Sequence, residues 1–92
     1  MELSIEERKF SFINEEGNHI AEMTYSLAGE KIIIIDHTEV HDDYRGNRLG
    51  YKLLLQVVEM AKNTGKKIMP LCPYAKSVFD KTDEFDSVLF KA

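Results

Sequence analysis

The first part of the chain alternates apolar and polar residues with the period of two that predicts β-strands. Lys9–Asn14 and His19–Leu27 both show this alternation, and the Glu-Glu-Gly-Asn sequence at 15–18 is typical of a turn, so the two segments predict a hairpin. A second turn at 28–30 leads into Lys31–Ile35, where four consecutive isoleucines break the alternation. An unbroken run of β-branched residues predicts a strand that is buried on both faces in the middle of a sheet.

The pattern changes to a helical period in the second part of the chain. Apolar residues recur with helical spacing from Asn47 to Asn63, and Gly65 follows as a helix stop. Lys67–Leu71 is then predicted to be a strand parallel to the one before the helix, because a strand, a crossover helix and a second strand form a right-handed parallel unit. A proline opens the second predicted helix, Pro73–Lys81. Phe85–Phe90 is interpreted as an edge strand.

Composition narrows the class of protein. The 92 residues are expected to form one domain, 1–92, and 43% hydrophobic with 30% charged residues is ordinary for a soluble globule. No apolar run approaches the roughly 20 residues of a membrane span, and the acidic N-terminus does not resemble a signal peptide, so a cytoplasmic location is expected. The net charge of −4 argues against a nucleic-acid surface and favours a cationic or amine partner. We expect the protein to be a monomer. We also expect no metal site, since the three histidines and the single cysteine show no ligand spacing.

The clearest chemical signal lies where the apolar strand that ends at Val40 runs into the sequence Arg-Gly-Asn-Arg-Leu-Gly at 45–50, which opens the first helix. The first amides of a helix have no intrahelical partner and its macrodipole makes that end positive, so the helix start attracts anions. Glycines let the backbone come close to a ligand, and arginines add fixed charge. The spacing matches neither the dinucleotide fingerprint nor the Walker loop, so these residues alone predict a phosphate-bearing ligand without naming it.

The sequence at 45–50 resembles the R-x-x-G-x-G/A acetyl-CoA loop of the GNAT acyltransferase superfamily, with Arg48 in place of the first motif glycine. The likeness covers roughly the last two-thirds of the chain. Within the superfamily it is most similar to a small single-domain subgroup, through the His-Thr-x-Val motif at 37–40 and the Cys-Pro-Tyr-Ala motif at 72–75. The resemblance implies a truncated GNAT-like α/β (α+β) fold: a mixed, mostly antiparallel sheet with a parallel crossover at the cofactor site and two main helices.

The resemblance also implies how acetyl-CoA or CoA is held. Backbone groups near Glu39 and Val40 would bind the pantetheine arm, and Arg45 would contribute more than Arg48 to pyrophosphate binding. The full set of residues expected to bind the cofactor is Val40, Arg45, Gly46, Asn47, Arg48, Leu49, Gly50 and Tyr51. The usual domain of the family has two helices between its first and second strands where this chain has only a turn, so the acceptor side is expected to be open.

Acetyl transfer to an amine needs a group that protonates the departing thiolate. Phe79 stands where the family often has a tyrosine for this step, which leaves Cys72, Tyr74 or solvent. Cys72 lies at a helix start that favours its thiolate, so it is alternatively an acyl-accepting nucleophile, or simply a small buried residue.

The amine also needs a general base, and His37 and Glu39 are the candidates. By strand alternation His37 is expected to share a face with Ile33 and Ile35, and it is alternatively a structural histidine. Two other interpretations stay open: a CoA-binding module without turnover, and a small structural or partner-binding domain whose Arg/Gly turn binds nothing specific. The amine acceptor stays unidentified.

Overall fold

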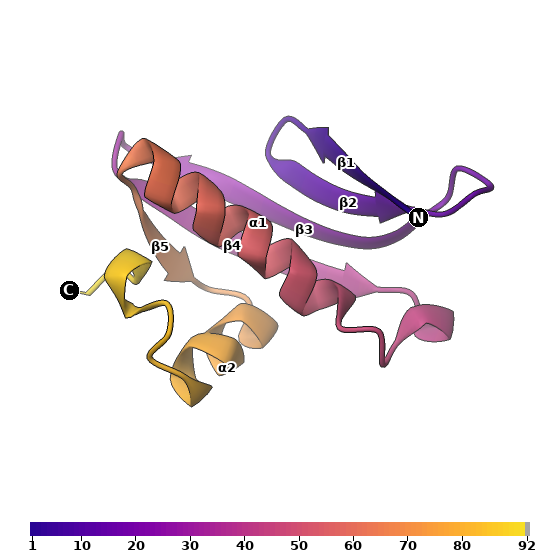
Figure 1. The fold of residues 1–92 in the computed structure, drawn as a ribbon. Coiled ribbons are helices and arrows are strands. Elements are labelled where there is room, and N and C mark those ends of the chain that lie inside the picture. Colours follow the sequence, from indigo (N-terminus) through magenta and orange to yellow (C-terminus); the bar gives the residue numbers. More distant parts are fainter. Residues whose placement is uncertain (92) are drawn as a thin grey trace.

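The computed structural model describes residues 1–91 (Figure 1). Five strands and two α-helices follow the chain in the order β1–β4, α1, β5, α2, with a short 3-10 helix after β4 and another after α2. Their bounds are β1 Glu2–Glu6, β2 Lys9–Ile13, β3 His19–Ala28, β4 Ile32–Val40, η1 Asp42–Tyr44, α1 Leu49–Thr64, β5 Lys67–Pro70, α2 Pro73–Lys81 and η2 Asp86–Val88.

The strands form one sheet in sequence order, β1-β2-β3-β4-β5. The first four strands pair antiparallel, whereas β5 pairs parallel to β4 after the crossover through α1. This mixed, mostly antiparallel sheet with two main helices confirms the predicted fold class. Gly65 ends α1 in the left-handed conformation with a φ of 70°, as a helix-terminating glycine should.

Strand β1 was not predicted, although Glu2–Glu6 alternates polar and apolar residues. It pairs with β2 along its whole length, from Glu2 opposite Ile13 to Glu6 opposite Lys9. The segment is short, acidic and mostly exposed, so its sequence carries little of the hydrophobic signal of a strand. Only two residues separate β1 from β2, where the usual domain of the family has two helices.

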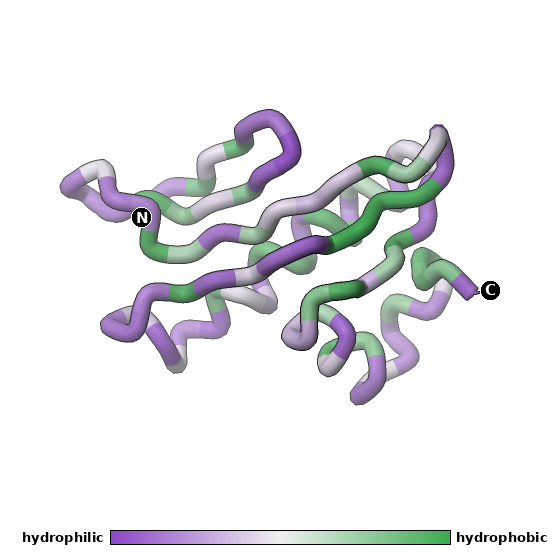
Figure 2. The backbone as a smooth tube through the Cα atoms, turned by 180° about the vertical axis from the view of Figure 1, so that it is seen from behind, coloured by the Kyte–Doolittle hydropathy of each residue, from purple (hydrophilic) through white to green (hydrophobic). Residues whose placement is uncertain are grey.

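Both helices cover the same face of the sheet, and residues 1–91 leave the other face bare (Figures 1 and 2). Ile33 and Ile35 point toward the helices and are fully buried, whereas Ile32 and Ile34 on the bare face are only half-buried. The prediction of a strand buried on both faces is therefore wrong. The isoleucine run does lie inside the sheet, between β3 and β5.

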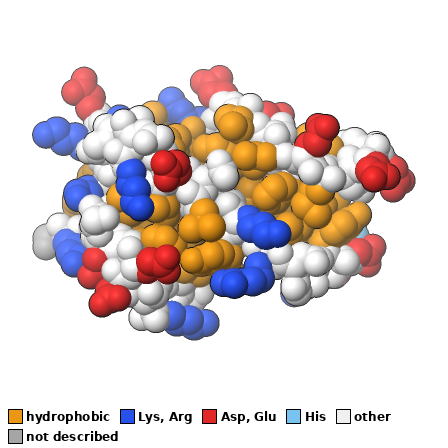
Figure 3. Space-filling model, viewed as in Figure 1, with side chains coloured by type: hydrophobic (Ala, Val, Ile, Leu, Met, Phe, Trp, Pro, Cys, Tyr) orange, Lys and Arg blue, Asp and Glu red, His pale blue; other side chains and the backbone are white. Residues whose placement is uncertain are grey.

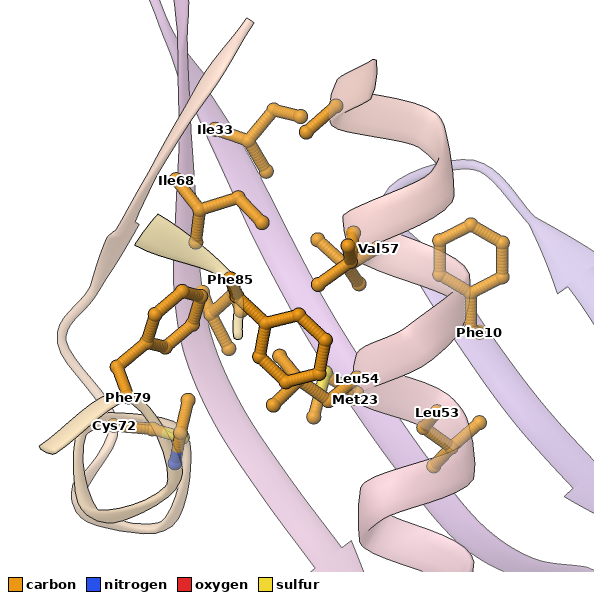
Figure 4. Packing of buried hydrophobic residues seen from close by; sticks show 14 of the residues in the cluster. Phe10, Met23, Ile33, Leu53, Leu54, Val57, Ile68, Cys72, Phe79 and Phe85 are labelled. Atoms are coloured by element: carbon orange, nitrogen blue, oxygen red, sulfur yellow. The ribbon is translucent and has the colours of Figure 1, made fainter. Parts of the chain in front are cut away.

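The hydrophobic core lies between the sheet and one stripe of α1 (Figure 4). Leu53, Leu54 and Val57 of α1 are fully buried, and they pack in one cluster with Met23 of β3 and Ile33 of β4. Truncating one such residue to alanine typically destabilises a protein by about 2–5 kcal/mol, so this contact fixes the start of α1 relative to β4.

The predicted edge strand Phe85–Phe90 is wrong. Phe85, the N-cap of the 3-10 helix η2, and Val88, its last residue, are both buried in the core, and Phe85 packs edge-to-face on Phe79 with 5.9 Å between ring centres. In place of a strand, an isolated parallel bridge between Leu89 and Ile68 and a hydrogen bond from Nζ of Lys67 to the carbonyl of Ser87 join this segment to β5. The apolar residues of the segment thus follow a helical spacing, which explains why they did not alternate.

A β-bulge divides β4 into two halves. Thr24 pairs with His37 and the next residue of β3, Tyr25, pairs with Ile35, which leaves Asp36 as the extra residue. The bulge reverses the alternation, so that Thr38 rather than His37 continues the face of Ile35. The prediction that His37 shares a face with the buried isoleucines is therefore wrong, and His37 and Glu39 lie on the bare face.

Candidate active site

A cavity of about 340 Å³ lies where β4 ends, α1 begins and α2 comes alongside. It is lined by Thr38, Val40, Tyr44, Arg45, Gly46, Arg48, Leu49, Gly50 and Tyr74. Seven of these residues are among the site residues predicted from the sequence. Thr38 and Tyr44 were not, although Thr38 belongs to the His-Thr-x-Val motif that was noted.

One side of the cavity is the edge of β4 that β5 leaves uncovered. The two strands pair only from Ile32–Ile35 to Lys67–Pro70, whereas β4 continues to Val40. At the point of separation the amides of Leu71 and Cys72 both donate to the carbonyl of Ile35. Beyond Ile35, the described part of the chain places no strand on this side of β4, so its backbone groups there are available to a ligand.

The loop between η1 and α1 takes an unusual backbone path. Gly46 has a φ of 90°, and Arg48, the N-cap of α1, has a φ of 56° in the left-handed region. A residue with a side chain in the left-handed region is destabilising by about 1–2 kcal/mol. This strain explains why the R-x-x-G-x-G/A motif has a glycine where this chain has Arg48. Arg48 makes no side-chain cap, so the first amides of α1 point to the cavity without a capping partner. Asn47 donates to the carbonyl of Tyr44 over 3.0 Å and holds the turn.

The two arginines of the loop have different surroundings. Arg45 is 73% exposed, and its Nε lies 3.0 Å from Oδ1 of Asp42, so its charge is partly neutralised. The guanidinium of Arg48 lies over the ring of Tyr51, 4.5 Å from the ring centre. Figure 3 shows Lys and Arg side chains among the exposed apolar side chains of this face, while most acidic side chains lie toward its rim. Arg45 is thus paired with a carboxylate and Arg48 rests on an aromatic ring, and the expectation that Arg45 contributes more than Arg48 to pyrophosphate binding stays a prediction.

Tyr74, in the first turn of α2, forms the opposite wall of the cavity. Its ring lies against Gly50, where an added Cβ would be 3.1 Å from two ring carbons, so a glycine is what allows this contact. Burial raises the pKa of Tyr74, and the positive charge of Arg48 partly opposes the shift. The phenol therefore stays protonated further into the alkaline range than an exposed tyrosine would.

Cys72 is the N-cap of α2 rather than a lining residue of the cavity. Its Sγ accepts from the amide of Ala75 and lies 3.3 Å from Oγ1 of Thr38, which does line the cavity. Only 4% of Cys72 is exposed, and Phe79 is likewise a core residue (Figure 4). The structure thus places the thiol one residue away from the cavity, behind Thr38.

His37 and Glu39 do not line this cavity. They lie on the bare face, mostly exposed, with 3.8 Å between Nε2 and Oε2. Glu39 does line a neighbouring cavity of about 330 Å³, which shares Thr38, Val40 and Arg45 with the first. Glu39 is therefore at the margin of the site, and His37 contacts it only through Glu39.

The family model for GCN5-related N-acetyl-transferases matches residues 9–88. The chain belongs to this family. A GCN5-like protein from Staphylococcus aureus, solved by NMR, is 37% identical over 99% of this chain and 89% of its own, with a TM-score of 0.83. No curated protein matches the sequence.

More distant structures share the fold of this GCN5-related chain. A GNAT family N-acetyltransferase from Escherichia coli in complex with CoA is 20% identical, with a TM-score of 0.64 over 77% of this chain and 43% of its own. N-acetylglutamate synthase from Neisseria gonorrhoeae, complexed with CoA and N-acetyl-glutamate, is 16% identical, with a TM-score of 0.66 over 80% of this chain and 18% of its own. Neither α-helix in the described residues is long and apolar enough to cross a membrane.

Proposed function

We propose that the chain binds acetyl-CoA in the 340 Å³ cavity and transfers the acetyl group to an amine. The observation that carries this proposal is the meeting of three features in one cavity. The uncovered edge of β4 offers backbone groups, the start of α1 offers free amides, and Arg48 offers a positive charge. Together they suit a long ligand that has amide groups at one end and phosphates at the other.

The residues present fit such a ligand. The backbone from Thr38 to Val40 would hold the pantetheine arm in the manner of a strand partner, and the amides at the start of α1 would hold the pyrophosphate. Gly46 leaves the space beside the loop free, since a Cβ added there would meet nothing within 4 Å, and Gly50 lets the ring of Tyr74 lie against the start of α1. Acetyl-CoA, when bound, supplies the activated acetyl thioester. Residues of the chain would carry out the two proton transfers, from the amine and to the departing sulfur.

Glu39 is the residue that we assign as proton acceptor for the amine. Glu39 lines the cavity next to the acetyl-CoA pocket, and its side chain is 68% exposed, so an amine would reach it from solvent. His37, beside it, would take part in sharing the proton. Tyr74 is assigned as the donor to the departing sulfur, because its phenol lines the pocket and carries a proton at neutral pH. Burial of Cys72 favours direct transfer over an acyl-cysteine route.

A CoA-binding module without turnover is the second candidate function. It is favoured by the burial of Phe79, which packs on Phe85 where the family often has its acid, and by the exposure of His37 and Glu39. Exposed groups are poorly fixed for proton transfer. Binding is common to both candidates, so the two differ only in turnover.

Heteronuclear NMR titration with acetyl-CoA tests the binding step. We expect amide shifts that cluster at 38–40 and 45–51 at millimolar ligand or below. Shifts elsewhere, or none, would show that the Arg/Gly turn only begins a helix. Turnover is then measured with a panel of primary amines on the wild type and Glu39→Gln. Loss of turnover in Glu39→Gln with unchanged CoA affinity supports the transferase, whereas saturable binding without turnover on any amine supports the module.

A further inference from the structure

We infer that Arg48 and Lys81 bind the 3′-phosphate of CoA in a second cavity, so that the chain distinguishes CoA from 3′-dephospho-CoA. The inference rests on the proposed function, because it concerns the far end of the same ligand. The cavity has a volume of about 400 Å³ and lies between the start of α1 and the length of α2. It shares Arg48 and Tyr74 with the acetyl-CoA pocket, so the two cavities are neighbours along one surface.

The backbone of Arg48 is the first argument. A non-glycine residue in the left-handed conformation persists only where its surroundings hold it there, and such residues gather at functional sites. Glycine would suit the φ of 56° without strain, so the conformation itself gives no reason for an arginine. The side chain does give one, since it lines both cavities and its guanidinium rests on Tyr51.

The chemistry of the lining is the second argument. The second cavity joins two cations, Arg48 and Lys81, to two aromatic rings, Tyr51 and Tyr74. Aromatic faces stack on a purine base, and a guanidinium binds phosphate oxygens with paired hydrogen bonds. Glu84 is the one carboxylate that lines this cavity. Among common ligand fragments, an adenosine carrying a phosphate matches this combination of rings and cations.

Charge decides which way the ligand continues from the first cavity. The other neighbouring cavity, beyond Thr38, is lined by the carboxylates of Glu39 and Asp42, and the only arginine there, Arg45, is paired with Asp42. Phosphates are repelled on that side and attracted on the side of Arg48 and Lys81. The acetyl end is thereby directed toward Glu39 and the phosphates toward the groove between the helices.

The experiment compares CoA with 3′-dephospho-CoA by isothermal titration calorimetry on the full chain. We expect the wild type to prefer CoA by about five- to tenfold, the range of an exposed charge-assisted contact. Arg48→Gly keeps the left-handed backbone and removes only the side chain, and it should reduce the preference to about twofold or less. Lys81→Met should reduce it in the same direction.

Matched controls separate this contact from a general loss of positive charge. Lys76 lies on the same helix as Lys81 but pairs with Asp80 at 3.1 Å, so Lys76→Met should keep the full preference for CoA. Arg45→Ala should weaken both ligands by the same factor. Equal affinity of the wild type for both ligands would overturn the inference, as would an equal loss for both ligands in Arg48→Gly, which would place Arg48 on the pyrophosphate. If neither ligand binds the wild type, the proposed function fails instead.

Discussion

Substitution of Gly50 tests whether the contact between α1 and Tyr74 shapes the acetyl-CoA pocket. An alanine Cβ at this position would lie 3.1 Å from two carbons of the Tyr74 ring and 3.3 Å from its hydroxyl oxygen. These distances are a few tenths of an ångström too short, so either the ring or the helix must move. Tyr74 is 37% exposed and free to move outward, whereas α1 is fixed by its buried stripe.

The effect on stability follows from two opposing contributions. Alanine in a helix is more favourable than glycine by up to about 1 kcal/mol, and a crowded contact that cannot relax is destabilising by about 1–3 kcal/mol. Because the ring at Tyr74 moves, we expect the free energy of unfolding of Gly50→Ala to stay within about 1 kcal/mol of the wild type. The affinity for CoA should nevertheless fall at least about tenfold, or about 1.4 kcal/mol, since the new methyl group and the displaced ring both enter the cavity.

Urea unfolding and calorimetric titration of CoA measure the two quantities on the same protein. Gly50→Val should abolish detectable CoA binding, because its larger side chain fills the space beside the loop. The double variant Gly50→Ala with Tyr74→Ala removes the crowded ring and should recover part of the affinity lost in Gly50→Ala. Unchanged affinity in Gly50→Ala, or a loss of stability of more than about 2 kcal/mol, would refute the reasoning.

Three further predictions concern the proposed proton transfers and the thiol. Turnover should persist at pH 10, the ordinary pKa of a tyrosine, and decline only above it. The reason is that the donor acts while protonated and burial raises the pKa of Tyr74. Tyr74→Phe should lower turnover at every pH and remove that decline, with CoA affinity retained; a decline that survives in Tyr74→Phe would assign it to another group. Iodoacetamide should alkylate Cys72 more slowly in the folded chain than in urea, because the thiol is buried. The position of Cys72 at a helix start had instead predicted a fast reaction. Fast alkylation that CoA prevents would show that the thiol is reactive and lies in the site. In urea unfolding, Cys72→Ser should keep the free energy of unfolding of the wild type, because serine keeps an acceptor for the amide of Ala75. Cys72→Ala has no such acceptor and should lower the free energy of unfolding by about 1 kcal/mol. Equal stability of the two variants would show that the helix cap contributes nothing.

The order of the elements follows from local patterns in the sequence. The hairpin turn at 15–18, the helix stop at Gly65 and the proline that opens α2 are all local signals, and the structure confirms each of them. The loop at 45–50 was likewise found from its residues, since glycines and arginines at a helix start have a meaning that does not depend on distant contacts.

Apart from the missed strand β1 and the local misinterpretation of Phe85–Phe90, the errors concern distant contacts. The isoleucine run does not indicate that both helices pack on the same face of the sheet, so the predicted burial of Ile32 and Ile34 was too high. A bulge needs a partner strand to be seen, and without the pairing of Thr24 with His37 the alternation of β4 could only be extended unchanged. The positions of Cys72 behind Thr38, and of Arg48 over Tyr51, depend on packing between elements in the same way.

The extra residue at Asp36 gives the second half of β4 two sides with different surroundings. Thr38 and Val40 line the cavity that we propose for acetyl-CoA, whereas His37 and Glu39 are mostly exposed on the other side of the strand. Substitution of His37, which lines neither cavity, can therefore alter the bare face without changing the proposed pocket, whereas Glu39 also borders the neighbouring cavity that Thr38 and Val40 line. In a domain with so few elements, a single inserted residue lets one strand vary its two ligand-facing surfaces separately, so the specificity for one ligand can diverge among relatives while the other is kept.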